Sequence, residues 1–526
     1  MKQKNLLLFI ICLLSCHLPI GCQSTFLNSD QRSELYDMMI REIEAHDAEA
    51  IHTRNITKKT NWKDFISLRK AAILEAENAR ELKKALDVFF SGYVNLHSRY
   101  QFLYPMDEFP SVNWKSKQEL GFTYPGFHFF EMESGDKIDL INGVAIDSLF
   151  ESYSDLRCRG GNKSYCAGRF ISDIEGNRLI VSRDSLSGFS LENGKEVKLH
   201  YDTTSTRDRY AEIIKSIEIE DYLEDWTVVE KGYKVALLQK ENIALVKIKD
   251  FVYTKGSDGG LRCSEEAGDS TQCADIQLLR RGISSIKEKT KQLIIDLQDN
   301  PGGNENSRFI AELCPAEFKD LAVQFRKAPI LEEYELRQYL FYGSEKTENW
   351  YQGLKSNGTY DDVDEGAFFP AIGDFCRGSD SCKLVPIPPN PTARRDWKSI
   401  SILVNEGTAS SGDDFTYRLH KYGRAGIIGQ PQGADLTYSV LKVLFYIDKE
   451  GNIQKKYVKN PQEDYEVAGT LLLECDIPFS RSIDDEGKHL QGNPLHLDLE
   501  VPITPDNFKK RNQVVLQAAV DRIWSN

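Results

Sequence analysis

Apolar residues recur at helical spacing in the first hundred residues of the chain. In "SDQRSELYDMMIREIEAH", Leu35, Met38 and Ile43 fall three to five positions apart behind a cap-like Ser29. The stretch "RKAAILEAENARELKKALDVFFSGYV" continues in the same manner. The pattern predicts a helical N-terminal domain, which we place at residues 23–115.

A strand pattern follows. "ESGDKIDLINGVAIDSLFES", from Glu133 to Ser152, predicts a strand, a turn at Gly143, a second strand and the start of a helix. It resembles the later strands of a PDZ domain, where a "GD-I--ING" pattern recurs, although a generic Asn-Gly hairpin explains it about equally well. We assign residues 116–231 to a PDZ-like domain. Such a domain is expected to bind substrate C-termini by strand addition and carboxylate capture.

From residue 232 onward, apolar runs alternate with amphipathic stretches. "NIALVKIKDFV", "KQLIIDLQDNPGG", "SISILVNEGTASSGDDF" and "RAGIIGQPQG" are typical of buried strands, and "DIQLLRRGISSIKEKT" of an amphipathic helix. This alternation predicts an α/β core with parallel strands over residues 232–526. The long stretch at about 305–398, rich in Gly, Pro and acidic residues near its end, is predicted to be an insertion in that core.

The N-terminus has the features of a secretory signal peptide. "MKQKNLLLFIICLLSCHLPIGC" carries Lys2 and Lys4 before an apolar run that is too short to span a bilayer. It resembles a bacterial lipoprotein signal, in which the first mature residue is a lipid-modified cysteine. Both Cys16 and Cys22 are candidates, and Cys22 is favoured, so residues 1–22 are assigned to the signal. The expected location is the cell envelope, periplasmic or at the outer surface, with membrane contact through the lipid alone.

The remaining cysteines predict disulfides in an oxidising compartment. Six form close pairs in sequence, and two more would be left to pair over a long range: Cys158/Cys166, Cys263/Cys273, Cys376/Cys382 and Cys314/Cys475. Cleavage before Cys22 leaves an even set, whereas cleavage before Cys16 leaves an odd thiol. The close pairs lack the tight spacing of zinc knuckles, so no metal is expected.

Charge excludes some partners. The 526 residues carry a formal net charge of −14 and are 40% hydrophobic. A nucleic-acid binder needs a basic face to displace counterions from phosphates, so that class is disfavoured. Simple adhesion to anionic lipid is disfavoured for the same reason. The oligomeric state stays open.

Two strand ends carry the candidate chemistry. In "LIIDLQDNPGG" a strand leads to Gly302 and Gly303, whose backbone N–H groups can approach a ligand closely and form an oxyanion hole. In "ILVNEGTASSGDDF" a strand delivers Ser410 and Ser411 to the first turn of a helix. Singly, these are an ordinary turn and an ordinary helix cap. The two motifs in this order are a far more specific indication of an active site.

These runs, with "YGRAGIIGQPQG" and "DLEVPITPDN", resemble the tail-specific or C-terminal processing serine peptidases and their tricorn-core and interphotoreceptor-retinoid-binding relatives. The resemblance implies a crotonase-like (ClpP-like) α/β core, often with a PDZ domain upstream, and hydrolysis of peptide or protein substrates. No cofactor is expected.

Carried over residue by residue, the resemblance implies that Ser410 is the nucleophile. It also implies that the Ser411 N–H and that of Gly302 or Gly303 form the oxyanion hole. The processing branch takes its general base from a lysine twenty-five residues after the serine, and here that position is Asp435. A supporting glutamine is replaced by Ser439. A Ser–Lys mechanism is therefore excluded at these positions.

The tricorn-like branch instead takes a histidine from the N-terminal region. "YVNLHSRYQF" places His97 in an element that resembles its "L-DGHT" motif. A neutral imidazole with a pKa near 6.5 suits general-base catalysis at neutral pH. A packed or surface role is the commoner fate of a single histidine, but the missing lysine favours the catalytic one. Candidate supporting residues are Ser98, Asn95 and Gln491, whereas His420, His489 and His496 are expected to be structural or solvent-facing.

The favoured hypothesis is an exported serine endopeptidase with a Ser–His site. The alternative is a catalytically inactive protein of the same fold that binds a peptide or an apolar ligand at the cell envelope. The distance between His97 and Ser410 discriminates between them.

Overall fold

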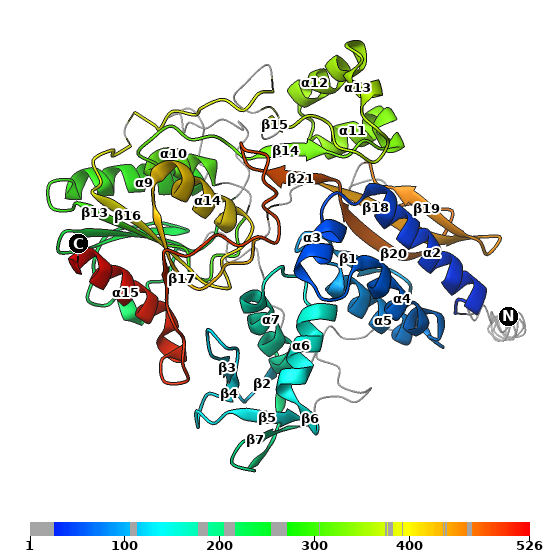
Figure 1. The fold of residues 1–526 in the computed structure, drawn as a ribbon, viewed down its shortest axis with the longest axis horizontal. Coiled ribbons are helices and arrows are strands. Elements are labelled where there is room, and N and C mark those ends of the chain that lie inside the picture. Colours follow the sequence, from blue (N-terminus) through cyan, green and yellow to red (C-terminus); the bar gives the residue numbers. More distant parts are fainter. Residues whose placement is uncertain are drawn as a thin grey trace, which may run out of the picture.

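The computed structural model describes residues 26–105, 113–176, 188–204, 216–253, 271–303, 306–373, 376, 382–391, 393–434, 436, 439–459 and 465–525. The predicted signal peptide with Cys16 and Cys22, as well as Cys263 and Asp435, lies outside these residues. Figure 1 shows three parts: the C-terminal core with α15 at one end, the N-terminal helices α2–α5 at the other, and a middle domain around α6 and α7 between them.

A seven-stranded sheet forms the C-terminal core, in the order β10-β11-β12-β13-β16-β17-β22. The first three strands are antiparallel to one another, and the strands from β12 onward are parallel. Their bounds are β10 Thr227–Lys231, β11 Val235–Lys240, β12 Ile243–Ile248, β13 Gln292–Asp296, β16 Ser399–Val404, β17 Gly426–Gly429 and β22 Leu499–Glu500.

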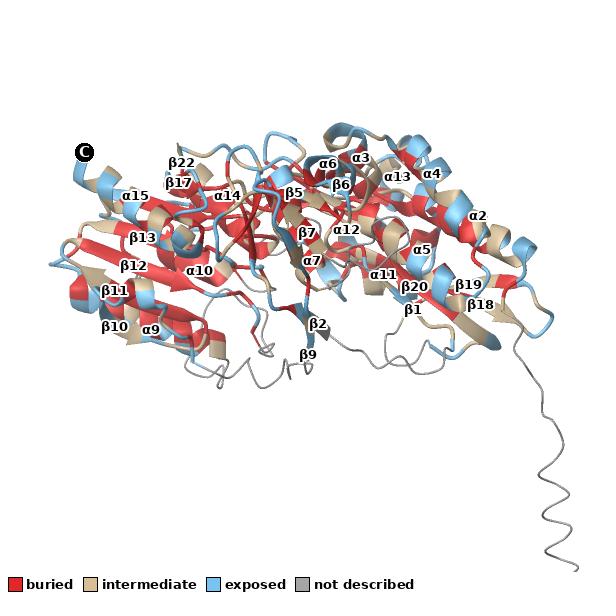
Figure 2. Cartoon of the chain, turned by 90° about the horizontal axis from the view of Figure 1, so that it is seen from below, coloured by how far each residue is buried: buried red, intermediate tan, exposed pale blue. Residues whose placement is uncertain are grey.

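The parallel strands are continuous apolar runs because helices cover both faces of the sheet. Helices α9 (Thr271–Ile286), α10 (Ser307–Leu313) and α14 (Ser411–Gly423) pack on the face that carries Leu293 and Ile295. Helix α15 (Arg511–Ser525) packs on the opposite face, against Ile294 and its neighbours. In Figure 2 the central strands β12 and β13 are coloured as buried. The prediction of an α/β core with parallel strands is confirmed.

The N-terminal part is helical, as predicted, but strands from another part of the chain contribute to its hydrophobic core. One buried cluster unites residues of these helices, such as Phe89, with Val443 and Cys475 of a four-stranded antiparallel sheet, order β1-β20-β18-β19. Strands from residues 440–478 therefore complete the core of the first hundred residues. The elements are α2 Ser29–His46, α3 Ala50–Thr57, α4 Trp62–Leu74, α5 Ala79–Gly92, β1 Tyr100–Phe102, β18 Val440–Asp448, β19 Ile453–Tyr457 and β20 Gly469–Pro478.

The middle domain contains the predicted strand–turn–strand–helix unit. Strands β5 and β6 pair across Asn142 and Gly143, both at positive φ, and α6 begins directly afterwards. Three small sheets and two helices surround one aromatic-rich core. The elements are β2 Asn113–Ser116, β3 Leu120–Phe122, β4 Phe129–Glu131, β5 Ile138–Ile141, β6 Val144–Ala145, α6 Ile146–Leu156, α7 Lys163–Glu175, β7 Gly188–Leu191, β8 Glu196–Lys198 and β9 Tyr201–Thr204.

The stretch between β13 and β16 packs as an insertion against the N-terminal core. Beyond α10 it contributes a group of short helices and the strands β14 and β15. These two strands form a three-stranded sheet, order β15-β14-β21, with β21 from the stretch after β20. Its buried residues, among them Phe341 and Tyr351, belong to the same cluster as the N-terminal helices. The elements are β14 Ala322–Phe325, α11 Tyr334–Leu340, α12 Glu345–Ser356, α13 Thr359–Asp362, β15 Ile372–Gly373 and β21 Ser480–Ile483.

The predicted disulfides between cysteines close in sequence are present where the structure describes both partners, whereas the predicted long-range disulfide is not. Disulfides join Cys158 to Cys166 and Cys376 to Cys382, and Cys273 is also disulfide-bonded. The predicted pairing of Cys314 with Cys475 is wrong, because both are free and buried. Cys314 lies in the core under the seven-stranded sheet, and Cys475 lies in the core of the N-terminal helices, so two different cores separate them. Along the described ranges, no helix is long and apolar enough to cross a membrane.

We predict that alkylation under denaturing, non-reducing conditions modifies Cys314 and Cys475 but spares Cys158, Cys166, Cys376 and Cys382. Under native conditions Cys314 and Cys475 are expected to react slowly, because burial raises the pKa of each thiol. Peptide mapping by mass spectrometry measures both outcomes. A peptide in which Cys314 is cross-linked to Cys475 would contradict the structure.

Candidate active site

Ser410 lies at a strand-to-helix corner in the middle of the seven-stranded sheet. Strand β16, between β13 and β17, ends at Val404, and helix α14 begins at Ser411. Ser410 has φ 55° and ψ −120°, a backbone conformation that a non-glycine residue rarely adopts. Its side chain makes no capping hydrogen bond to the helix. The ordinary helix-cap explanation of this serine therefore does not hold, and strain of this kind is typical of functional sites.

His97 lies against this serine. Its Nε2 is 3.3 Å from Ser410 Oγ, although 313 positions separate the two residues in sequence. The histidine sits in the loop between α5 and β1. Asn95 holds that loop, because its Oδ1 accepts hydrogen bonds from the N–H of His97 at 2.7 Å and of Ser98 at 3.2 Å. This side chain fixes the backbone from which the imidazole projects.

The two predicted glycines lie at the start of α14, Gly302 against Ser410 and Gly303 against Ser411. A methyl group on Gly302, which has φ +90°, would lie 2.6 Å from Ser410 Cβ and 2.6 Å from Ala409 O. The N–H of Gly302 donates to Asn300 Oδ1 at 2.9 Å, so this amide is already engaged. The Ser411 hydroxyl donates to Gly303 O at 2.6 Å, which ties the start of α14 to the glycine loop. Of the predicted donors, this favours the N–H groups of Gly303 and Ser411.

Asn405 and Asn300, which the sequence analysis did not identify, connect the loop after β13 with the loop after β16. Asn405 Oδ1 accepts from Asp299 N at 2.9 Å and Gly407 N at 2.9 Å, and its Nδ2 donates to Asp299 Oδ1 at 3.0 Å. Asn300 O accepts from Ala409 N at 3.0 Å, and its Nδ2 donates to Ile248 O at 3.0 Å. Both asparagines follow buried parallel strands that are neighbours in the sheet, and that position in the sequence is the signal that could have revealed them.

Comparison with known proteins agrees with this geometry. Residues 242–454 match the model of peptidase family S41. The chain carries an S41 peptidase domain. No curated protein matches the sequence.

Solved structures share the fold of the whole chain. A crystal structure of mature CPAF superposes with a TM-score of 0.58 at 13% identity, covering 94% of this chain and 96% of that one. Mature CPAF complexed with lactacystin gives a TM-score of 0.54 at 13% identity, covering 94% and 98%. At this identity the likeness shows the fold, which therefore extends beyond the S41 domain to the N-terminal helices and the middle domain.

The candidate supporting residues occupy different places around the S41 domain. Ser98 is fully buried, and its hydroxyl has no hydrogen-bond partner within the described ranges. Gln491 Oε1 accepts from Leu436 N at 2.7 Å, in the loop after β17. Ser439, at the position of the family glutamine, donates to Leu340 O at 2.9 Å. The side chains of Gln491 and Ser439 thus bond to main-chain groups.

The histidines that were expected to be structural or solvent-facing lie in such surroundings. His420 Nδ1 lies 2.8 Å from Ala425 O at the end of α14. His489 Nε2 lies 3.0 Å from Glu49 Oε2, and burial lowers the pKa of His489 to about 4. His496 is exposed.

The Cys158–Cys166 disulfide closes a loop that is connected to helix α14 through one intermediate residue. Asn162, at the tip of that loop, donates its Nδ2 to Gln432 O. Gln432 in turn donates its Nε2 to Asp413 Oδ1 in α14 at 2.6 Å. Gly161 also packs against Gly492, because a methyl group on Gly161 would lie 2.6 Å from Gly492 Cα. The middle domain thus supports the helix that begins next to Ser410.

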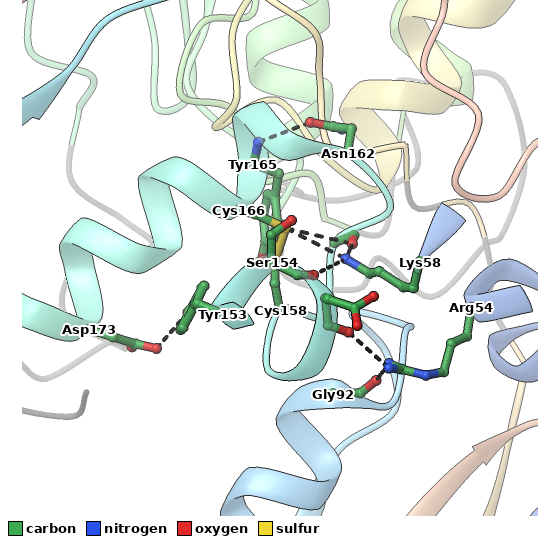
Figure 3. The surroundings of a disulfide bond; sticks show 12 residues. Arg54, Lys58, Gly92, Tyr153, Ser154, Cys158, Asn162, Tyr165, Cys166 and Asp173 are labelled. Carbon is green, nitrogen blue, oxygen red and sulfur yellow. Dashed lines mark hydrogen bonds between the residues drawn. A yellow bond between two sulfur atoms is a disulfide. The ribbon is translucent and has the colours of Figure 1, made fainter. Parts of the chain in front are cut away.

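Arg54 of α3 and Lys58, the residue after α3, donate to backbone carbonyl groups beside this loop and, at Gly160, within it (Figure 3). Arg54 donates to Gly92 O at 2.5 Å and to Asp155 O at 2.9 Å. Lys58 donates to Ser154 O and to Gly160 O, both at 2.7 Å. Its Nζ lies 3.7 Å from Cys166 Sγ. Burial, reinforced by the charge of Arg54, lowers the pKa of Lys58 to about 7.

We predict that replacing Gly302 by alanine displaces Ser410. The added methyl group has no room beside Ser410 Cβ, and a shift of about 1 Å in a reacting group costs on the order of 10²-fold in rate. The measurement is the rate at which a fluorophosphonate probe labels Ser410. Gly135→Ala is the matched control, because Gly135 has a similar φ of +76° but open space around it. Equal labelling of the two variants would contradict the close approach.

We also predict a pH-dependent stability that depends on Lys58. Above pH 7 the folded protein holds this lysine mostly neutral, whereas the unfolded chain keeps it protonated to about pH 10.4. The unfolded chain therefore binds more protons in this window, and the contribution of Lys58 to the free energy of unfolding rises with pH. In urea unfolding between pH 7 and pH 9, Lys58→Met should remove that rise. Lys59→Met is the control, since Lys59 is exposed beside Glu151. The same slope in Lys58→Met and in the unmodified protein would refute the assignment.

Proposed function

We propose that this protein is an exported, lipid-anchored serine endopeptidase that hydrolyses peptide bonds in protein or peptide substrates through Ser410 and His97. The S41 domain supports a serine-type peptidase. The observation that carries the Ser–His assignment is the 3.3 Å separation of Ser410 Oγ and His97 Nε2. The sequence offers Asp435 at the position where the processing branch has its lysine.

In the proposed reaction, His97 Nε2 accepts the proton of the Ser410 hydroxyl as the oxygen attacks the carbonyl carbon of the scissile bond. The negative charge that develops on the carbonyl oxygen is stabilised by the N–H groups of Gly303 and Ser411, at the start of α14, whose helix dipole adds positive potential. Protonated His97 then donates to the leaving amine, whose departure gives an acyl-enzyme. Water, deprotonated by His97, hydrolyses the ester and regenerates Ser410.

The acidic residues of the loops around the proposed nucleophile are paired with a cation. Both acidic residues of the motif loops, Asp299 and Glu406, are directed toward Arg511, with separations of 3.5 Å and 3.8 Å. Burial raises the pKa of Glu406, whereas Arg511 helps to hold that of Asp299 low. Pairing with Arg511 offsets much of the negative charge that would otherwise accumulate behind the nucleophile loop.

The envelope location rests on the N-terminal sequence and on the disulfides Cys158–Cys166 and Cys376–Cys382, which fit an oxidising compartment. Lipid attachment at Cys22 is tested by metabolic labelling with a radioactive fatty acid in a bacterial host. The label is expected to disappear in Cys22→Ala and to persist in Cys16→Ala, and the reverse result would move the anchor to Cys16.

The catalytic assignment is tested with a fluorophosphonate probe and a quenched peptide library. Ser410→Ala should abolish labelling, and His97→Ala should slow it by about 10³-fold or more, because the serine loses its base. Ser411→Ala should still be labelled, since it removes a neighbouring hydroxyl and keeps the backbone N–H. His420→Ala controls for the loss of a histidine. Labelling that is absent from the unmodified protein, or that survives His97→Ala undiminished, would favour the catalytically inactive alternative or a different base.

A further inference from the structure

Strand β3 of the middle domain has one edge paired within the domain and one edge directed away from it. It pairs with β4, and flanking bonds from Thr123 N to His128 O and from Met132 N to Glu119 O, both 2.9 Å, continue that pairing. Backbone groups alternate sides along an antiparallel strand. Leu120, Phe122 and Tyr124 therefore direct their N–H and C=O groups to the second edge. Such an edge is where an extended peptide is added as a further strand.

The chain's own C-terminal segment already pairs with this edge. Tyr124 N donates to Ile503 O at 2.8 Å, and Ile503 N donates to Tyr124 O at 2.7 Å. Ile503 follows β22, the outermost strand of the seven-stranded sheet. A piece of the peptidase core thus forms the antiparallel pair that an added peptide would form.

The same segment also supplies a side-chain anchor. After a turn closed by Thr504 N to Asn507 Oδ1 at 2.8 Å, Phe508 enters the core of the middle domain. Its ring lies 5.6 Å from that of Phe122 and 5.5 Å from that of Phe130, and only 7% of the residue is exposed. A backbone pair together with a buried aromatic anchor is the usual way in which a domain holds a peptide.

A carboxylate occupies the other end of the edge. Leu120 N donates to Glu175 Oε1 at 3.0 Å, and Glu175 is the last residue of α7. Domains that capture peptide C-termini use backbone N–H groups at the start of such a strand to bind the terminal carboxylate. Here a side-chain carboxylate of the same chain fills that position.

We propose that Glu175 and residues 501–508 act as an internal ligand of the middle domain, so that the enzyme selects internal segments of its substrates and does not recognise their C-terminal carboxylates. This inference rests on the proposed function and differs from what the PDZ resemblance implied. The internal ligand fastens the middle domain to the sheet that carries Ser410. Substrate choice then falls to the surfaces around Ser410 itself.

The first test compares two fluorescein-labelled degenerate decapeptide pools that are identical except for a C-terminal carboxylate or carboxamide. With the full chain carrying Ser410→Ala, which binds without cleaving, both pools should be retained within about twofold of each other. With the unmodified enzyme, cleavage of the two pools should likewise agree within about twofold. A preference of about tenfold or more for the carboxylate pool in either measurement would overturn the inference.

The second test removes the side chains that occupy the free edge of β3. Adding Glu175→Ala and Phe508→Ala frees Leu120 N–H and removes the anchor, and a hydrogen bond to a charged group of this kind favours the carboxylate pool by about tenfold. Glu133→Ala, an exposed glutamate of the same domain, is the control and should show no preference. If the double variant does not fold, Glu175→Ala alone should still shift retention toward the carboxylate pool. A folded variant without that shift would show that the edge of β3 is not a carboxylate-binding site occupied by the chain's own residues.

These binding measurements separate the two proposals. They use protein without the nucleophile, so they stand even if the unmodified chain proves inactive. Conversely, cleavage that depends on Ser410 and prefers free C-termini would support the peptidase and refute the internal ligand.

Discussion

The approach of His97 to Ser410 is the constraint on which the rest of the architecture depends. The two residues are 313 positions apart, yet their side chains must be held within 3.3 Å. A hydrogen bond cannot bring such distant segments together, because its net contribution is only about 1 kcal/mol. The positioning has to come from packing. The shared buried cluster, in which Phe89 of the N-terminal helices and Cys475 of β20 both lie, provides it.

Backbone contacts then fix the histidine loop against that sheet. Asp476 N donates to Arg99 O at 2.8 Å, and Ala48 N donates to Pro478 O at 2.8 Å, so the chain before α3 and the chain after α5 are both bonded to the end of β20. On the side of the middle domain, Arg54 donates to Asp155 O of α6, and Lys58 donates to Gly160 O in the disulfide loop that reaches Gln432. The N-terminal helices are therefore held by both neighbouring parts, and His97 lies two residues before Arg99, which is bonded to β20.

The sequence predicted what is local and missed what depends on distant packing. The strand ends at Gly302 and Ser410 were recognisable because each motif needs only its own strand and turn. The pair Cys314/Cys475 was predicted wrongly, because counting cysteines cannot show that two buried thiols belong to different cores. The shared core of the first hundred residues with β18 and β20 was likewise invisible, since helical periodicity shows that a face is buried but not what buries it. Asn300 and Asn405 were overlooked because their importance lies in joining two loops about a hundred residues apart.

The loop after β17 shows how a site can do without the lysine of the processing branch. In that branch this loop carries the lysine that acts as the general base and a glutamine that supports it. Here Gln432 of this loop donates to the Asp413 side chain in α14, Ser439 donates to Leu340 O, and Leu436 N donates to Gln491 Oε1. Under the proposed mechanism the proton goes to His97, on a segment that packs from the opposite side. Asp413 lies in the first turn of α14, so its hydrogen bond with Gln432 helps to fix the start of this helix next to the strained backbone of Ser410.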